Sequence, residues 1–149
     1  MSKIADLEIA TGRFFELHWP STETHLSQPL WENWSTFLYK SVPNNKFGGC
    51  YALFEKGTLL YIGKGVSAKD GISKRLSSHV LGVKSYAENP GEHLSYLREK
   101  WSDVTEIWTI GFTKEWDYLA HALEIFLIRQ LQPIKNKHNL ILFELIMLL

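Results

Sequence analysis

Two tyrosines, Tyr51 and Tyr61, stand ten residues apart on either side of a short apolar hairpin, in the stretch YALFEKGTLLYIGKG. Arg75 and His79 follow four residues apart, so a helix would present both on one face. A phenol or an imidazole can hold or accept a proton, and a guanidinium matches the oxygens of a phosphate. These residue types suit chemistry at a phosphate, provided that the fold brings them together.

An acid within an apolar segment adds a further component. Glu124 lies in LAHALEIFLIRQL, where its neighbours on a predicted helix are Ala120, Leu127 and Ile128. An unpaired carboxylate there would be costly, so it needs a partner, a metal ion or a water-filled cleft. The alternative is an exposed edge of an amphipathic helix. Asn136, in the PIKN that follows, is by itself most simply a turn residue.

Composition limits the class of protein. The chain has 149 residues, one cysteine and a formal net charge of zero. This length suits one domain, and the lone cysteine excludes an internal disulfide and suits a reducing, cytoplasmic compartment. We expect no signal peptide and no membrane span. Residues 64–84 hold five bases and one acid, which could track phosphates, although a solvated helix face explains that charge as well.

The apolar pattern predicts a mixture of strands and helices. Strands are expected at GGCYALF, TLLYIG and WTIGF, and one amphipathic helix in PLWENWSTFLYKSV. A second helix over GISKRLSSHVL would begin after Asp70 and end at Gly82, with an apolar stripe of Ile72, Leu76 and Val80. A third would run from a cap at Thr113 through Leu131, before Pro133.

The loop of the hairpin decides whether the two phenols share a face. A three-residue loop, EKG, with Gly57 in the left-handed position, pairs Tyr51 with Tyr61 and projects both to one side. A two-residue loop at Lys56 and Gly57 would instead pair Tyr51 with Ile62 and send the phenols to opposite faces. We prefer the first register because the turn chemistry fits it. A purely structural cross-strand contact is the simpler explanation of the pair taken alone.

In their order and spacing these segments resemble the GIY-YIG endonuclease family. The resemblance covers roughly residues 46–137 and rests on GGCY, YIGKG, KRLSSH, a Glu inside a long apolar helix, and PIKN. The main departure is GCY in place of Gly-Ile-Tyr. The resemblance implies a small central antiparallel sheet of about three strands flanked by helices. We further expect a partly helical N-terminal extension (1–45) and an apolar tail (138–149) that packs on the domain or on a partner.

The resemblance also implies an activity, hydrolysis of a DNA phosphodiester bond with one Mg²⁺ or Mn²⁺ ion. The products would carry a 5′-phosphate and a 3′-hydroxyl. A single site makes one cut, so we expect nicking, unless a homodimer forms through the N-terminal helix or the tail. The alternative is a non-cleaving nucleic-acid-binding or protein-interaction module with the same fold.

The family's functional residues carry over onto this sequence. Glu124 would hold the metal ion, and Arg75 would stabilise the transition state at a phosphate oxygen. Tyr51 would orient or deprotonate water and Tyr61 would hold water or phosphate, although these roles could be exchanged. A phenol acting as a base near pH 7 would need its pKa lowered by about 3 units. His79 would take or relay the proton.

The remaining expected residues orient the site or contact the substrate. Asn136 would orient the site through hydrogen bonds. Gly63 would let the substrate approach the backbone, and Lys64 would add positive charge beside it. Lys74 and Lys135 would contact phosphates.

Overall fold

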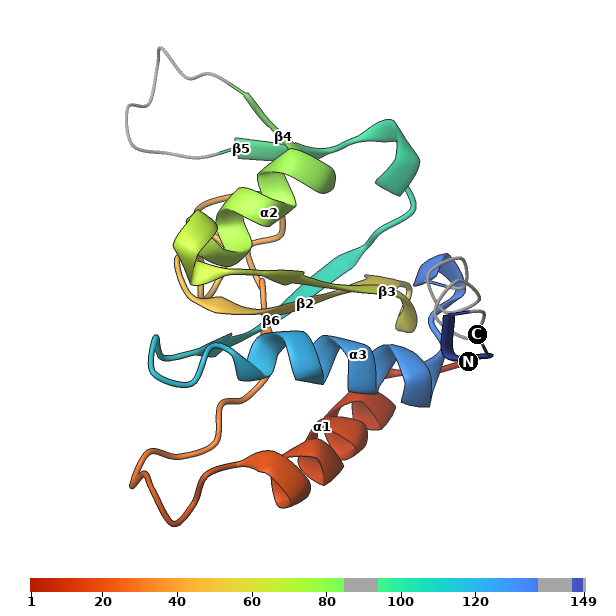
Figure 1. Ribbon diagram of the computed structural model, residues 1–149. Helices are drawn as coiled ribbons and strands as arrows, with labels where there is room; N and C mark the ends of the chain where they lie inside the picture. Colours follow the sequence, from red (N-terminus) through yellow and green to blue (C-terminus); the bar gives the residue numbers. More distant parts are fainter. Residues whose placement is uncertain (85–93, 137–145, 149) are drawn as a thin grey trace.

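A four-stranded antiparallel sheet with the order β1-β6-β2-β3 forms the centre of the fold (Figure 1). It was analysed in a computed structural model that describes residues 1–84, 94–136 and 146–148. A separate antiparallel ribbon pairs β4 with β5. The strands are β1 (Glu32–Asn33), β2 (Gly48–Glu55), β3 (Thr58–Gly65), β4 (Leu81–Lys84), β5 (Leu94–Leu97) and β6 (Glu106–Phe112). The predicted α+β class with a small antiparallel sheet is confirmed, and β1 and the ribbon are additions that the sequence did not indicate.

Helices cover both faces of this sheet (Figure 1). α2 and the β4–β5 ribbon lie on one side, and α3 lies on the other with α1 packed outside it. The helices are α1 (Ile4–His18), α2 (Gly71–His79) and α3 (Leu119–Leu131), with short 3₁₀ helices at Ser67–Lys69, Glu99–Trp101 and Ile134–Asn136. No helix within the described ranges is long and apolar enough to cross a membrane.

Alternation along β2 divides the core into two halves. Cys50, Ala52 and Phe54 pack with residues of α1 and α3. Tyr51 and Leu53 pack on the other side, with the apolar stripe of α2. That stripe, predicted from the spacing of Ile72, Leu76 and Val80, is confirmed, because all three side chains are fully buried. Since apolar burial stabilises by roughly 25 cal/mol per Å², both halves hold the sheet and its helices together.

The β2–β3 hairpin differs from the predicted register in its turn. Glu55 pairs with Thr58, so the loop has two residues, Lys56 and Gly57, and both have positive φ as a type I′ turn requires. A bulge then shifts the register beyond Phe54.

The bulge returns both phenols to one face of the sheet. Tyr51 pairs with Gly63, and Tyr61 pairs with Leu53. The extra residue restores the alternation that the two-residue loop had reversed, so Tyr51 and Tyr61 lie on the side of α2 with ring centroids 6.1 Å apart. The predicted three-residue loop and direct pairing are wrong, while the predicted common face is confirmed.

The N-terminal helix does not lie where the sequence predicts it. The stretch from Pro29 to Val42 is not helical, because Glu32 and Asn33 pair with β6 as a short edge strand. Trp31 and Trp34 consequently point into different halves of the core, which one helical stripe could not do. The helix of this region is α1, which packs on α3.

Two predicted helix boundaries are also wrong. α3 begins at Leu119 rather than after Thr113, because the intervening residues form turns. Trp116 is buried in the core there, and Asp117 accepts a hydrogen bond from the hydroxyl of Ser67. α2 ends at His79, and Gly82 lies in β4 rather than at the helix end. Gly82 suits the strand because the ring of Tyr96 occupies the space where a side chain would lie.

The sequence predicted an N-terminal extension and a C-terminal tail outside the central domain. Residues of the proposed extension (1–45) belong to both core halves, for example Phe14 in one and Trp34 in the other. The predicted docking of the apolar tail (138–149) falls largely outside the described residues. Residues 146–148, which are described, are exposed.

The ring of Tyr51 lies against Gly63 and leaves no room there for a side chain. A Cβ at Gly63 would lie 2.3 Å from Cζ of Tyr51, so the Gly63→Ala variant must displace the ring. We expect a loss of about 1–3 kcal/mol of unfolding free energy, measured by urea denaturation. Gly12→Ala is the matched control, because nothing lies within 4 Å of that position on α1. It should stabilise by up to about 1 kcal/mol, and equal effects of the two changes would contradict the packing argument.

Candidate active site

A cleft of about 810 Å³ opens where β3, α2 and α3 meet. Tyr61 and Lys64 reach it from β3, Arg75 from α2 and Glu124 from α3. Lys74 also lines it. Five of the residues singled out in the sequence therefore lie around one hollow, although they are far apart in the chain.

Tyr51 and His79 form the layer behind this cleft. The hydroxyl oxygen of Tyr51 lies 3.1 Å from Nδ1 of His79, within hydrogen-bond distance. Tyr51 is completely buried, whereas Tyr61 is partly exposed and lines the cleft. Tyr61 therefore lies between the cleft and the buried ring of Tyr51, whereas His79 is itself partly exposed.

Burial controls the protonation of both phenols. It raises the pKa of Tyr51 far above its ordinary value, and the neighbouring Tyr61 raises it further, while Arg75 offsets part of this effect. The pKa of Tyr61 is raised by burial and by Glu124, against smaller lowering effects of Arg75 and of a hydrogen bond with Tyr51. The guanidinium of Arg75 does lower the pKa of Tyr51, but desolvation outweighs it, so the lowering that a phenolic base would need is not reached by the chain alone. Both phenols are therefore hydrogen-bond donors at neutral pH.

His79 has the opposite shift. Burial lowers its pKa, and the positive charges of Arg75, Lys100 and Arg98 lower it further. The imidazole is neutral near pH 7, so Nδ1 can accept the proton of the Tyr51 hydroxyl. His79 is thus the group of this cluster best suited to accept a proton.

Trp101 fixes the imidazole and is a site residue that the sequence did not reveal. Its indole N–H donates to the backbone oxygen of His79 at 3.1 Å. Its ring centroid lies 5.0 Å from that of Tyr61 and 5.3 Å from that of His79. Trp101 reaches the cluster from a 3₁₀ helix between β5 and β6, and no periodic pattern in the sequence points to it.

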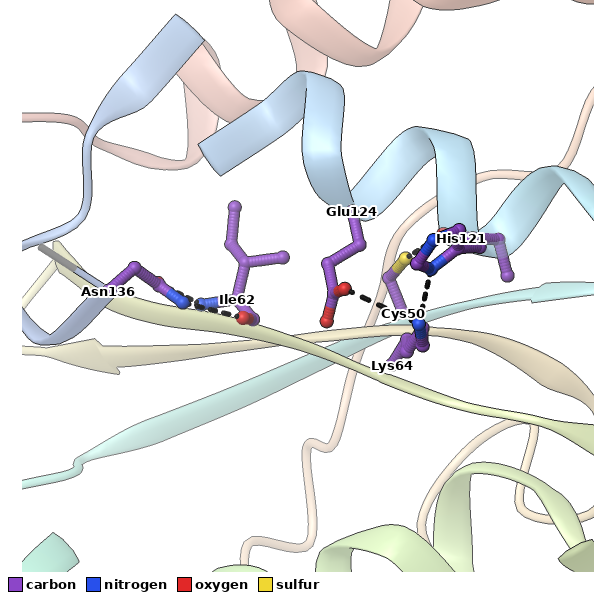
Figure 2. Close-up of polar contacts among 7 residues, drawn as sticks. Cys50, Ile62, Lys64, His121, Glu124 and Asn136 are labelled. Carbon is purple, nitrogen blue, oxygen red and sulfur yellow. Dashed lines mark hydrogen bonds and ion pairs between the residues drawn. The ribbon is translucent and has the colours of Figure 1, made fainter. Parts of the chain in front are cut away.

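Lys64 is the cation closest to the acid in the cleft. Figure 2 shows Glu124 hanging from α3 towards β3, with its Oε1 atom 3.8 Å from Nζ of Lys64. Lys64 also contacts Nδ1 of His121, which lies one helical turn before Glu124. His121 was missed, although its i−3 spacing from Glu124 places both residues on one face of the predicted helix.

The carboxylate of Glu124 is only partly compensated. Its side chain is 18% exposed, and burial raises its pKa despite the opposing charges of Lys64 and Arg75. A half-buried oxygen anion beside an open cleft is a suitable ligand for a hard divalent cation such as Mg²⁺. No group of three His, Cys, Asp or Glu side chains that could hold a metal occurs in the described part of the chain. Glu124 would therefore share the ion with water and phosphate oxygens.

Asn136 supports the site from behind, at the edge of the sheet. Its side chain accepts a hydrogen bond from the backbone N–H of Ile62 at 2.9 Å and donates one to the oxygen of Ile62 at 3.0 Å (Figure 2). These two bonds hold β3 beside Tyr61. Asn136 itself is buried, so its place agrees with an orienting role and not with contact to substrate.

Two expected substrate contacts do not lie in the cleft. The space above Gly63 is filled by the ring of Tyr51, so this glycine serves the packing of the phenol rather than the approach of a phosphate. Lys135 lies over the ring of Trp101, with Nζ 5.3 Å from its centroid, and donates to the backbone oxygen of Lys100 at 3.4 Å. It is exposed beside the aromatic cluster.

Comparison with known proteins leaves the class to be defined by fold and geometry. No family model, no curated protein and no solved structure matches this chain. The fold and site describe a small α+β protein in which Tyr61, Lys64, Arg75 and Glu124 line one cleft at the edge of an antiparallel sheet, together with the charged residues Lys69, Asp70 and Lys74.

The charge on Glu124 costs stability, and removing it should be measurable. Since burial raises the folded-state pKa of this carboxyl, the folded chain loses stability as the pH rises through that value. Glu124→Gln avoids this loss, so we expect its melting temperature to exceed that of the native chain near pH 7. The difference should shrink as the pH falls towards the ordinary Glu value of 4.5.

Thermal unfolding followed by circular dichroism at several pH values tests this expectation. Glu16→Gln is the matched control, because Glu16 is exposed on α1, and it should show no comparable pH-dependent gain. A Glu124→Gln variant that melts below the native protein at neutral pH would show that the ion pair with Lys64 outweighs the cost of burial.

Proposed function

We propose that this chain is a divalent-metal-dependent endonuclease that hydrolyses DNA phosphodiester bonds and makes single-strand nicks. The observation that carries the proposal is the meeting of Tyr61, Lys64, Arg75 and Glu124 around one open cleft. Cations, a hard oxygen ligand and a proton-handling group such as a phenol are groups that support hydrolysis of a phosphodiester. The products would be a 5′-phosphate and a 3′-hydroxyl, as the resemblance to GIY-YIG endonucleases implies.

The charged residues of the cleft have separate tasks in this proposal. Glu124 would hold the Mg²⁺ or Mn²⁺ ion, which when bound neutralises charge that develops on the phosphate. Arg75 is exposed on α2 and can pair with a non-bridging phosphate oxygen. Lys64 lies near the acid in the unliganded chain and would turn to the phosphate once another cation holds Glu124.

A relay of two phenols and one imidazole would remove the proton of the attacking water. Tyr61, at the cleft, would accept the water proton at its oxygen as it passes its own proton to the oxygen of Tyr51. Tyr51 would pass its own proton to Nδ1 of His79, from which its hydroxyl oxygen lies 3.1 Å. No phenol needs to be ionised beforehand, so this arrangement is compatible with the raised pKa values of both. Compared with the roles expected from the sequence, the two phenols are exchanged, because Tyr61 and not Tyr51 lies next to the attacking water.

The relay predicts the effect of single hydroxyl deletions. Tyr61→Phe and Tyr51→Phe should each lower kcat by about 10²–10⁴-fold with little change in KM, because each interrupts proton transfer. Tyr118→Phe is the matched control, since this tyrosine is 62% exposed and outside the cluster. Activity should also fall as the pH drops through the pKa of His79, which lies below 6.5. Full activity of Tyr51→Phe would rule out the relay.

Conversion of supercoiled plasmid to the nicked form tests the activity itself. We expect nicking with Mg²⁺ or Mn²⁺, none with EDTA, and none by Glu124→Ala. Arg75→Ala should slow it by about 10²–10³-fold, as the loss of one preorganised transition-state donor does elsewhere. Glu16→Gln, which removes an equal charge from α1, should nick like the native chain.

Other outcomes of the same assay would overturn the proposal. Equal nicking by the native chain and by Glu124→Ala would place the activity elsewhere or in a contaminant. A gel shift of DNA without any cleavage would favour the alternative, a non-cleaving binding module, for which the zero net charge and the pairing of Lys64 with Glu124 speak. A cytoplasmic location and homodimerisation through the N-terminal helix or the tail remain predictions.

A further inference from the structure

A second hollow lies on the other flank of α2. It has a volume of about 480 Å³ and is bounded by α2, the segment 40–46 and the β4–β5 ribbon. Lys40, Lys46 and Lys74 line it, and Asp70 is the one carboxylate among its described lining residues. The hollow therefore carries an excess of positive charge, although the whole chain has none.

Hydroxyl groups accompany these lysines. The hydroxyl of Ser67 donates a hydrogen bond to the carboxylate of Asp117, and the hydroxyl of Ser77 donates one to the backbone oxygen of Lys74. The other serines that line the hollow are Ser41, Ser73 and Ser95. Ammonium groups with hydroxyl donors are typical of contacts to the phosphates of a nucleic acid, which position it without reading its sequence.

Backbone hydrogen bonds hold the two carriers of the lysines together. The N–H of Ile72 donates to the oxygen of Phe47 at 3.0 Å, and the N–H of Ser73 donates to the oxygen of Asn45 at 2.7 Å. The first turn of α2 is thereby tied to the segment that bears Lys46. Because these amides already have partners, an anion in the hollow would be bound by side chains and not by the helix terminus.

The hollow adjoins the cleft at α2. Lys74 and Asp70 line both, so phosphates that leave the cleft over this part of α2 would meet Lys46 and Lys40 next. We propose that this hollow binds the phosphodiester backbone of the DNA strand beside the phosphate that is cut. This inference rests on the proposed nuclease function for its substrate, and it adds Lys40 and Lys46 as substrate-binding residues.

Binding measured without metal tests the hollow separately from cleavage. A short fluorescent DNA duplex is titrated with protein in EDTA, and anisotropy is followed at several salt concentrations. The variant Lys40→Gln/Lys46→Gln removes two exposed charges of the hollow. The matched control Arg13→Gln/Lys56→Gln removes two exposed charges from α1 and the β2–β3 turn. Melting temperatures confirm that each variant is folded.

The expected result is a loss of phosphate contacts in the first variant only. The plot of the logarithm of the association constant against the logarithm of the salt concentration has a negative slope. Its magnitude should decrease by about 0.9 for each lysine, and so by about 1.8 for both. The charge-preserving Lys40→Arg/Lys46→Arg variant should keep the native slope. In the nicking assay, Lys40→Gln/Lys46→Gln should raise KM and leave kcat near the native value.

The outcomes separate this inference from the proposed function. If the chain nicks DNA and Lys40→Gln/Lys46→Gln binds like the control variant, the nuclease stands and the hollow does not bind the strand. If the slope falls as expected but no nicking occurs, the hollow binds DNA and the nuclease proposal fails. Equal slope losses in the two glutamine variants would show non-specific attraction and overturn the inference.

Discussion

The candidate site depends on the position of β3 at the edge of the sheet. Along this strand Tyr61 points to the side of α2, and Lys64 points to the side of α3. In a central strand, such neighbours would be separated by the sheet and could not share a hollow. At an edge their side chains meet around the rim, so residues of α2 and α3 line one cleft. The side chain of Asn136 occupies backbone groups that this edge would otherwise leave open, which holds the strand in place.

Much of this arrangement follows from local sequence patterns. The alternation of apolar residues in GGCYALF and TLLYIG, the stripe of α2 and the i, i+4 spacing of Arg75 and His79 are visible without coordinates. The common face of the phenols was predicted correctly, but from an incorrect loop length. The two-residue loop shifts the register by one residue, and the bulge shifts it again. Together they leave each phenol on the predicted face of the sheet, but each phenol lies opposite a different residue from the one predicted. Sequence alone does not reveal a bulge that no glycine or proline marks.

Long-range contacts account for the parts that could not be predicted. Helical spacing of apolar residues around Trp31 and Trp34 is real, yet pairing with β6 gives each indole a separate core and a hydrogen-bond partner. The start of α3 is moved by the burial of Trp116 and the bond between Ser67 and Asp117. Trp101 joins the site only because the chain returns to it after the β4–β5 ribbon. In each case tertiary contacts outweigh a local preference worth at most about 1 kcal/mol per residue.

Burial sets the electrostatic character of the cluster in the unliganded chain. It keeps both phenols protonated and His79 neutral. It also raises the pKa of Glu124, although the cleft holds the positive charges of Lys64 and Arg75. Positive charge from an added cation would favour the anionic forms of Glu124 and of the phenols. The same charge would disfavour an imidazolium at His79. The place of His79 in the cluster is fixed through the backbone, because the indole N–H of Trp101 donates to the backbone oxygen of His79.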